Sequence, residues 1–375
     1  MAGNLFVQNT ITVIWDFDKT LSRTYMQAPL FARYKVNETE FWDEVNGLDA
    51  LYKAAGANRV SKDTLYLNHI LTYVRRGIFK NLNNSILKEL GSEIALYEGL
   101  PHFFDAVRSL SESSLFKLHD ITVEHYVVST GLRQMIMGSK VAPYVEDVWG
   151  CEFVETRGEP GYLKPGYQQR VGDGVIVDVA YAVDNTSKTR AIFEINKGTN
   201  KLSDIGVNDT IDPEDRRVPF QNMIYVADGP SDIPSFSIVN QYGGTTFAVY
   251  EPGNKKQFEQ VVDLQLKNRV KGIGEANYVE GSLSFMWILS AIERTAKRIV
   301  STRESFLQTR IGRSPQHIVG DTKPQDNTIE AVAEAAKAVV HDVAMLQSEP
   351  RDLGGNSGAP KKGPASESPD ERKLG

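Results

Sequence analysis

The segment Ile11–Leu21, which reads Ile-Thr-Val-Ile-Trp-Asp-Phe-Asp-Lys-Thr-Leu, decides the fold of this chain. Its apolar and β-branched start predicts a strand, and the strand ends at two carboxylates, Asp16 and Asp18. Alternate side chains of an extended segment share a face, so the strand end presents these two together while Phe17 points the other way. One carboxylate can attack and the other can move a proton. The alternative is a strand that merely ends in a polar turn.

A second apolar run, Tyr126–Val128, is followed by Ser129, Thr130 and Gly131. A hydroxyl at this position can donate a hydrogen bond to a phosphate oxygen. The glycine allows the backbone to approach a ligand closely. Alone, this short pattern would indicate little, because such triplets are common.

A third strand-like run, Tyr181–Asn185, leads into a predicted helix. Thr186 or Ser187 can cap the start of this helix, and Gly198 can end it. Lys188 then falls in the first helical turn, beside an N-terminus that is suited to anions.

The fourth run, Met223–Ala227, ends at Asp228, and Asp232 follows four residues later. Magnesium is a hard cation that favours carboxylate oxygens, and this spacing supplies two of them. A similar pattern at Asp173 and Asp178 lacks an apolar run before it. There a Gly-Asp-Gly turn that opens a strand is the better interpretation.

The four motifs, in this order, resemble those of the haloacid dehalogenase superfamily. The resemblance implies that Asp16 is the nucleophile and that Asp18 is the general acid/base. It also implies that Ser129 binds a phosphate oxygen and that Lys188 pairs with the nucleophile and the transferring phosphoryl group. Because the dehalogenating branch lacks a carboxylate at the position of Asp18, the resemblance favours phosphate over halide.

The same resemblance implies a Mg²⁺ cofactor. Its expected ligands are Asp16, the backbone carbonyl of Asp18, and Asp228. Asp232 is expected nearby, either as an outer ligand or as the partner that orients Lys188.

The predicted function is therefore that of a magnesium-dependent phosphatase. It would hydrolyse a phosphate monoester of a small metabolite through an aspartyl-phosphate intermediate. Two alternatives remain: a non-catalytic protein that keeps the fold to bind a phosphorylated ligand or a partner, and a phosphomutase. The presence of Asp16, Asp18 and Asp228 argues against the first alternative.

The segment Ser129–Arg133 resembles the Ser-Gly-Gly-Phe-Arg of phosphoserine phosphatases, which points to the phosphoserine-phosphatase-like branch. In this interpretation Arg133 grips a substrate carboxylate; the alternative is a surface residue of the following helix. Those enzymes also carry a glutamate shortly after the first motif, whereas Ser22–Arg33 contains no acid, which leaves the substrate open. Arg23 and Tyr25 are further candidate substrate contacts.

Composition limits the other classes of function. The chain has 375 residues, 41% of them hydrophobic, and a formal net charge of −6, so we expect a globular protein that does not bind nucleic acid. No apolar run reaches the roughly 20 residues that cross a bilayer. The N-terminus shows no targeting pattern and Cys151 is the single cysteine, so we expect no membrane association and a cytoplasmic location.

The predicted fold is α/β, a Rossmann-like doubly wound parallel sheet with an inserted helical cap and a helical C-terminal extension. Residues 1–24 and 97–255 would form the catalytic core. Residues 25–96 show apolar side chains at helical intervals and would form the cap, which resembles the cap that many members of the superfamily carry. The extension would span 256–348, and the polar tail, 349–375, would be disordered.

Other segments carry more local predictions. Phe247–Tyr250 is expected to be the last core strand, and Gly158–Val183 a hairpin-like excursion. Apolar stripes predict helices at Phe285–Val300 and Ile329–Leu346. The stripes are expected to pack on the main domain, with a homodimer through these C-terminal helices as the alternative.

Overall fold

The computed structural model describes residues 7–167 and 174–310. A seven-stranded sheet in the order β4-β3-β2-β1-β5-β6-β7 forms its centre. All neighbouring strands are parallel except β3 and β4, which confirms the α/β prediction. The strands are β1 (Thr10–Trp15), β2 (Thr122–Leu132), β3 (Asp147–Val154), β4 (Asp178–Tyr181), β5 (Met223–Ala227), β6 (Thr245–Tyr250) and β7 (Gly272–Glu275).

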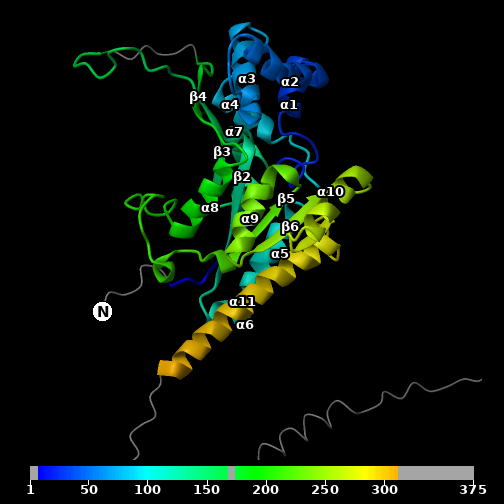
Figure 1. Cartoon of the computed structure of the whole chain (residues 1–375), viewed down its shortest axis with the longest axis vertical. Coiled ribbons are helices and arrows are strands. Elements are labelled where there is room, and N and C mark those ends of the chain that lie inside the picture. Colours follow the sequence, from blue (N-terminus) through cyan, green and yellow to red (C-terminus); the bar gives the residue numbers. More distant parts are fainter. Residues whose placement is uncertain (1–6, 168–173, 311–375) are drawn as a thin grey trace, which may run out of the picture. The chain divides into compact units, whose positions relative to one another are not determined.

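Both faces of the sheet are covered by helices (Figure 1). Strand β1 lies in the middle and is buried along its whole length, with Val13 and Trp15 on one face and Ile14 on the other. This alternation places apolar side chains in two separate cores, as the two-residue period of a strand requires. The first core contains α5 (His102–Ser111) and α11 (Leu283–Arg310); the second contains α8 (Ser187–Lys197), α9 (Ile233–Gln241) and α10 (Lys255–Leu266).

Four α-helices lie within residues 25–96, where the sequence predicts a helical insert. They are α1 (Ala28–Tyr34), α2 (Glu38–Ala54), α3 (Leu65–Arg75) and α4 (Asn84–Gly91). Phe31, Phe41 and Phe79 are buried together at their centre, with the Phe31 and Phe41 rings 4.7 Å apart. The two connections to the insert pair with each other, since the Arg23 amide donates to the Ala95 carbonyl at 2.9 Å.

Helix α4 packs very closely on α7 (Arg133–Gly138), the helix that follows β2. A Cβ at Gly138 would lie 1.7 Å from the Lys88 carbonyl oxygen, and one at Gly91 would lie 2.1 Å from the Met135 carbonyl oxygen. The two glycines therefore allow the two backbones to touch. The last helix of the insert is thus packed against the main fold.

The prediction that Phe247–Tyr250 is the last core strand is wrong, because β7 pairs with β6 at the edge of the sheet. Two of the four residues of β7 are glycines, Gly272 and Gly274. Glycine has low strand propensity, so the sequence did not indicate a strand here. A Cβ at Gly272 would lie 2.5 Å from the Trp287 ring of α11. The glycines are needed because α11 approaches this strand closely.

After β3 the chain returns in β4, which runs antiparallel to β3. Of the residues of Gly158–Val183 that the structure describes, the four of β4 are in a strand. Asp173 lies outside the described residues. Asp178 is the first residue of β4, its side chain is 46% exposed, and it pairs with Arg157 at 2.8 Å. The strand that the Gly-Asp-Gly turn was expected to open would start at Val175, directly after the turn. The observed strand β4 starts three residues later, at Asp178.

Helix α11 confirms the predicted helix at Phe285–Val300 and its packing on the main fold. Ile288, Ile292 and Ala296 are fully buried, whereas Met286 is 53% exposed. Ile329–Leu346 and the polar tail lie outside the described residues.

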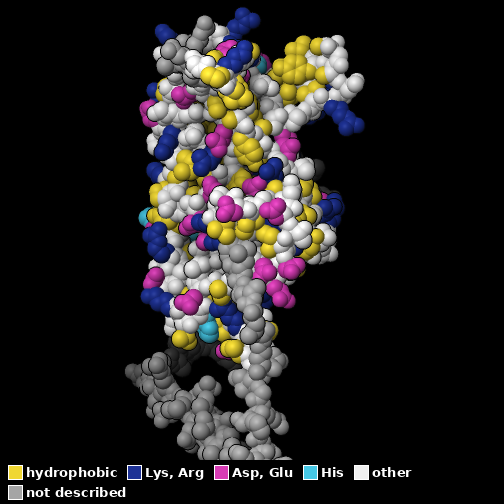
Figure 2. Space-filling model, turned by 90° about the vertical axis from the view of Figure 1, so that its left-hand side faces the viewer, with side chains coloured by type: hydrophobic (Ala, Val, Ile, Leu, Met, Phe, Trp, Pro, Cys, Tyr) yellow, Lys and Arg dark blue, Asp and Glu magenta, His cyan; other side chains and the backbone are white. Residues whose placement is uncertain are grey.

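On the face that Figure 2 shows, acidic and basic side chains are interspersed. Among the residues described, no helix combines the length and apolar character needed to span a membrane.

Candidate active site

Asp16 follows β1 directly and is still held by the sheet, because its amide donates to the Val226 carbonyl of β5 at 2.9 Å. Its carboxylate is 5% exposed, and its Oδ2 accepts a hydrogen bond from Thr20 Oγ1 at 3.1 Å. Asp18 lies two residues on, and its Oδ1 accepts from the Met26 amide at 2.8 Å. Both carboxylates are therefore fixed by backbone and hydroxyl donors at the carboxyl end of the central strand.

Lys188 lies in the first turn of α8, as predicted, and its side chain is 1% exposed. Its Nζ donates to Asp16 Oδ1 and to Asp232 Oδ1, each at 2.7 Å. The predicted capping is wrong, because neither Thr186 nor Ser187 caps the helix with its hydroxyl. The carboxylate of Asp184 instead accepts from the amides of both residues, which orients the turn that carries Lys188.

Gly198 ends α8 in the left-handed conformation, with φ +82°, as the sequence predicts. A residue with a side chain would be strained there.

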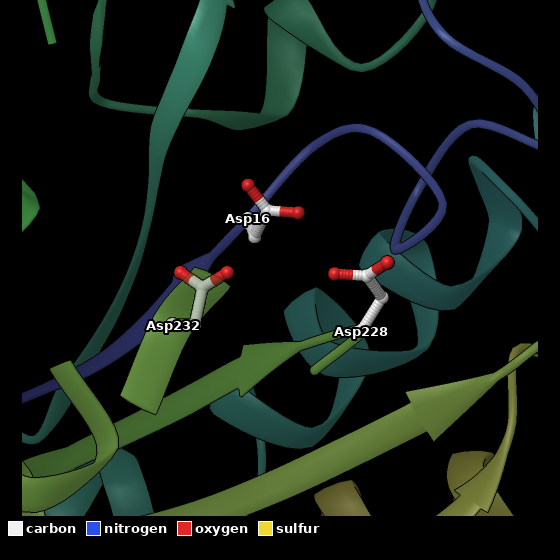
Figure 3. Close-up of side chains that lie close together, drawn as sticks. All are labelled: Asp16, Asp228 and Asp232. Atoms are coloured by element: carbon white, nitrogen blue, oxygen red, sulfur yellow. The ribbon is translucent and has the colours of Figure 1, made fainter. Parts of the chain in front are cut away.

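Three carboxylates lie around a common space, as Figure 3 shows: Asp16, Asp228 and Asp232. Each offers an oxygen, and these oxygens lie within 4.8 Å of one another. Asp228 follows β5, and Asp232 begins α9. Asp232 is fully buried and accepts hydrogen bonds from the Tyr225 hydroxyl at 2.5 Å and from Ser231 Oγ at 2.8 Å.

Sequence reasoning did not identify Tyr225 or Thr20 as part of the site. Tyr225 sits inside the apolar run of β5, where a tyrosine is ordinary strand packing. Thr20 could have been identified from the sequence, because it is a hydroxyl residue two positions after Asp18, within the first motif.

The electrostatics of the site are those of crowded buried carboxylates. Burial, reinforced by the charge of Asp232, raises the pKa of Asp16 to about 6 even though Lys188 opposes the shift. Burial and the charge of Asp16 raise the pKa of Asp18 to about 7. Burial and the charges of Asp16 and Asp232 raise the pKa of Asp228 to about 8.

Burial alone would lower the pKa of Lys188, but its two carboxylate partners outweigh burial and hold the pKa well above its ordinary value. Lys188 is therefore the ammonium cation of the cluster, and it cannot compensate all of the carboxylates around it. A divalent cation bound between Asp16, Asp228 and Asp232 would offset the remaining repulsion. The donor set, all carboxylate oxygen, suits a hard ion such as Mg²⁺.

The second motif forms the end of β2, beside β1. Ser129 is 1% exposed, and its Oγ accepts a hydrogen bond from the Gly131 amide at 3.0 Å. Thr130 accepts at its carbonyl from the Tyr66 hydroxyl of α3 at 2.6 Å. A Cβ at Gly131 would lie 2.1 Å from Met26 Cε, so in this structure the missing side chain makes room for methionine.

Arg133, a predicted substrate contact, instead binds residues of β3. Its Nε donates to the Val148 carbonyl of β3 at 3.0 Å, and its guanidinium lies 3.6 Å from both Asp147 and Glu152. Arg23 also has protein partners, the Leu96 carbonyl at 3.2 Å and Glu98 at 3.1 Å.

The sheet order and the four motifs resemble those of the haloacid dehalogenase-like superfamily. An uncharacterized protein of Borreliella burgdorferi is 40% identical over 292 residues, which cover 76% of this chain and 97% of that protein. The chain belongs to the same family as this protein. No family model matches the chain.

Solved structures are similar at lower identity. A HAD family hydrolase of Salmonella enterica serovar Typhi aligns with a TM-score of 0.41 and 13% identity, covering 71% of this chain and 66% of that one. A phosphoserine phosphatase with an analogue of its phospho-aspartyl intermediate aligns with a TM-score of 0.38 and 16% identity, covering 71% of this chain and 93% of that one. These similarities concern the fold, and the chemistry of the site rests on its own geometry.

Proposed function

We propose that this protein is a phosphatase that hydrolyses a phosphate monoester through an aspartyl-phosphate intermediate on Asp16. The observation that carries the proposal is the buried contact of Lys188 Nζ with Asp16 and Asp232, each at 2.7 Å, next to a second carboxylate at Asp18. A buried nucleophile, a neighbouring acid and a fixed cation are the three groups that this reaction needs.

In the first step Asp16 attacks phosphorus in line and the bond to the ester oxygen breaks. Asp18, as the carboxylic acid, gives its proton to the departing alkoxide. In the second step the Asp18 carboxylate takes a proton from water, whose oxygen attacks phosphorus, and inorganic phosphate and free Asp16 result. A pKa of about 7 suits a group that gives and takes a proton near neutral pH.

Lys188 has two tasks in this scheme. It holds Asp16 in position and favours its ionised form, and its ammonium lies where it can neutralise a phosphoryl oxygen. Phosphoryl transfer depends chiefly on such positioning and charge stabilisation. The residues that would hold Mg²⁺ are Asp16, Asp228, the backbone carbonyl of Asp18 and Asp232, directly or through water; the ion would supply charge neutralisation at the phosphate.

The test is turnover of p-nitrophenyl phosphate. The wild-type chain should hydrolyse it with magnesium, lose the activity with EDTA, and regain it when magnesium is restored. Asp16→Asn, which keeps the size but removes the attacking charge, should lower kcat by at least about 10³-fold while the protein stays folded. Near-normal turnover by Asp16→Asn, or full activity without a divalent metal, would contradict the proposal.

A further inference from the structure

A cavity of about 530 Å³ lies between the insert and the end of β2, and Asp18 is one of its lining residues. The insert contributes side chains of α2 and α3, and β2 contributes Thr130 and Gly131. If the proposed function holds, this is where the leaving group of the ester must sit, because Asp18 protonates it. The chemistry of the lining therefore limits the substrate class.

The cavity lining is acidic. Beyond Asp18, three carboxylates line it, and none of them has an ion-pair partner among the residues that the structure describes: Glu38, Asp43 and Asp63. One lysine, Lys62, also lines the cavity, but its Nζ pairs with Asp49 at 3.2 Å. A leaving group with a carboxylate would meet repulsion here, whereas a cation would be attracted.

Aromatic rings stand beside these carboxylates. The Trp42 ring lies 5.3 Å from Tyr25 and 5.9 Å from Tyr66, and all three line the cavity. Tyr66 is fixed by its bond to the Thr130 carbonyl, and Trp42 Nε1 donates to Glu38 at 3.4 Å. Ring faces attract ammonium groups, and Lys19 Nζ already lies 4.1 Å from the Tyr25 ring centre.

Gln27 supplies an independent observation. It lines the cavity, it is 2% exposed, and its buried Oε1 has no hydrogen-bond partner within the described part of the chain. A buried acceptor without a donor is costly, so a bound group that carries N–H would relieve the cost.

We propose that the substrate of this site is the phosphate monoester of an amino alcohol, whose ammonium group lies against Trp42 and Tyr66 and faces the unpaired carboxylates. The inference rests on the phosphatase function proposed above. The engagement of Arg133 with β3 agrees with it, because no arginine of the described residues lines the cavity to take a substrate carboxylate.

Matched pairs of esters test this class. The first pair is 2-aminoethyl phosphate against propyl phosphate, and the second is phosphocholine against 3,3-dimethylbutyl phosphate. Size is similar within each pair; the members of the second pair differ in charge, and those of the first pair differ in charge and in hydrogen-bond donors. The cationic member should have the higher kcat/KM by roughly 5- to 30-fold, which is the range of a cation–π contact with partial desolvation. Equal values in both pairs, or preference for the neutral members, would overturn the proposal.

The first pair also separates hydrogen bonding from ring contact. Gln27 and the carboxylates can accept from a primary ammonium but not from a quaternary one, so preference confined to 2-aminoethyl phosphate assigns the recognition to these acceptors. Preference in both pairs assigns it to the rings as well. Phosphoserine adds a carboxylate to the first ester, and it should be a poorer substrate than 2-aminoethyl phosphate; the reverse order would contradict the acidic lining.

Variants locate the effect. Trp42→Leu and the double variant Glu38→Gln/Asp43→Asn should each reduce the cationic preference at least about threefold, and thermal unfolding should first show that each variant is folded. Glu40→Gln is the matched control, since Glu40 is an exposed carboxylate of the same helix outside the cavity lining. An unchanged preference in both cavity variants would place recognition elsewhere and overturn the assignment.

Failure of the phosphatase function can be distinguished from failure of this inference. If the wild-type chain hydrolyses no ester, including p-nitrophenyl phosphate, the proposed function fails. The cavity is then tested by calorimetric binding to Asp16→Asn. Tighter binding of phosphocholine than of 3,3-dimethylbutyl phosphate would support the cation site, and equal affinity would reject it.

Discussion

Lys188 shows how one side chain determines the state of a whole site. It is buried, and its ammonium is shared between Asp16 and Asp232 at equal distances of 2.7 Å. Such a buried charge is tolerated only because its partners are charged and hydrogen-bonded as well. The same contacts that allow it to be buried also hold the carboxylate of Asp16, the proposed nucleophile, in place.

Lys188→Met therefore should affect both stability and activity. Two buried carboxylates would lose their cation, so we expect unfolding to become easier by roughly 3–5 kcal/mol and hydrolysis to fall by at least about 10²-fold. Urea unfolding and p-nitrophenyl phosphate turnover measure the two effects. The double variant Lys188→Met/Asp232→Asn should regain stability but not activity; recovery of both would show that Lys188 is only structural.

Arg190→Gln is the control for this change. Arg190 lies on the same helix, but it is exposed and forms a surface ion pair with Glu194, so its loss should change stability by less than about 0.5 kcal/mol.

His125 is a titratable group that lies outside the catalytic cluster. It is buried in β2, its Nδ1 accepts from Trp15 Nε1 at 3.2 Å, and burial lowers its pKa to about 3. The unfolded histidine has a pKa of about 6.5 and takes up a proton there, whereas the folded one stays neutral. Its contribution to stability is therefore present above the unfolded pKa and is lost as the pH falls from there toward 3.

The predicted loss between about pH 7 and about pH 5.5 is on the order of 1 kcal/mol of unfolding free energy. It should appear in urea unfolding of the wild-type chain and be absent from His125→Gln. The carboxylates titrate in both proteins, so their contributions cancel in the comparison. The same pH dependence in both proteins would mean that His125 takes up its proton at the same pH in the folded and in the unfolded state.

At the residue scale, the sequence predicted the members of the catalytic cluster better than the substrate contacts. Asp16 and Asp232 lie close together because β1 and β5 are neighbouring parallel strands, whose carboxyl ends lie at the same edge of the sheet. Lys188 reaches both carboxylates from the first turn of α8, which follows the antiparallel strand β4. The partners of Arg133 could not be predicted in this way. They depend on the pairing of β3 with β2, which the sequence around Arg133 does not predict.

At the scale of elements, strong periodicity predicted the helices of the insert and α11, and Gly198 predicted the end of α8. Strand β7 was not predicted, because its glycines allow close contact with α11 but have low strand propensity. The capping of α8 was also predicted wrongly. The hydroxyl of Thr186 or Ser187 was expected to cap the helix, but the carboxylate of Asp184 accepts the hydrogen bonds from the amides of these two residues.

The close packing of α4 on α7 gives a prediction at the same scale. Gly138→Ala should destabilise the protein by roughly 1–3 kcal/mol, because the new methyl group would overlap the backbone of Lys88. Gly47→Ala should instead stabilise it by about 0.5–1 kcal/mol, because Gly47 is inside α2 with open space around it. Urea unfolding measures both. If the two alanine variants were equally stable, α4 and α7 would not be in contact as described.

At the scale of the whole molecule, the proposed chemistry and the proposed choice of substrate come from different parts of the chain. The groups proposed to act on phosphorus lie in the four motifs, whereas Trp42 and Tyr66 come from the insert between the first two motifs. The insert is attached to the main fold by the packing of α4 on α7 and by the bond from Tyr66 to Thr130. This attachment sets the width of the cavity between α3 and the end of β2.

Two conservative variants separate these contributions. Thr20→Val removes the hydroxyl that holds Asp16 Oδ2, so it should lower kcat/KM for methyl phosphate and for p-nitrophenyl phosphate by the same factor, roughly tenfold. Tyr66→Phe keeps the ring but frees α3 from Thr130. A methyl group leaves the cavity filled with water, whereas an aryl group contacts both walls, so this variant should change the ratio of the two kcat/KM values by at least about threefold. Thermal unfolding would first establish that both variants are folded. An equal loss of kcat/KM for both esters in Tyr66→Phe would show that the insert does not select the leaving group. A changed ratio of the two kcat/KM values in Thr20→Val would contradict the separation of the two contributions.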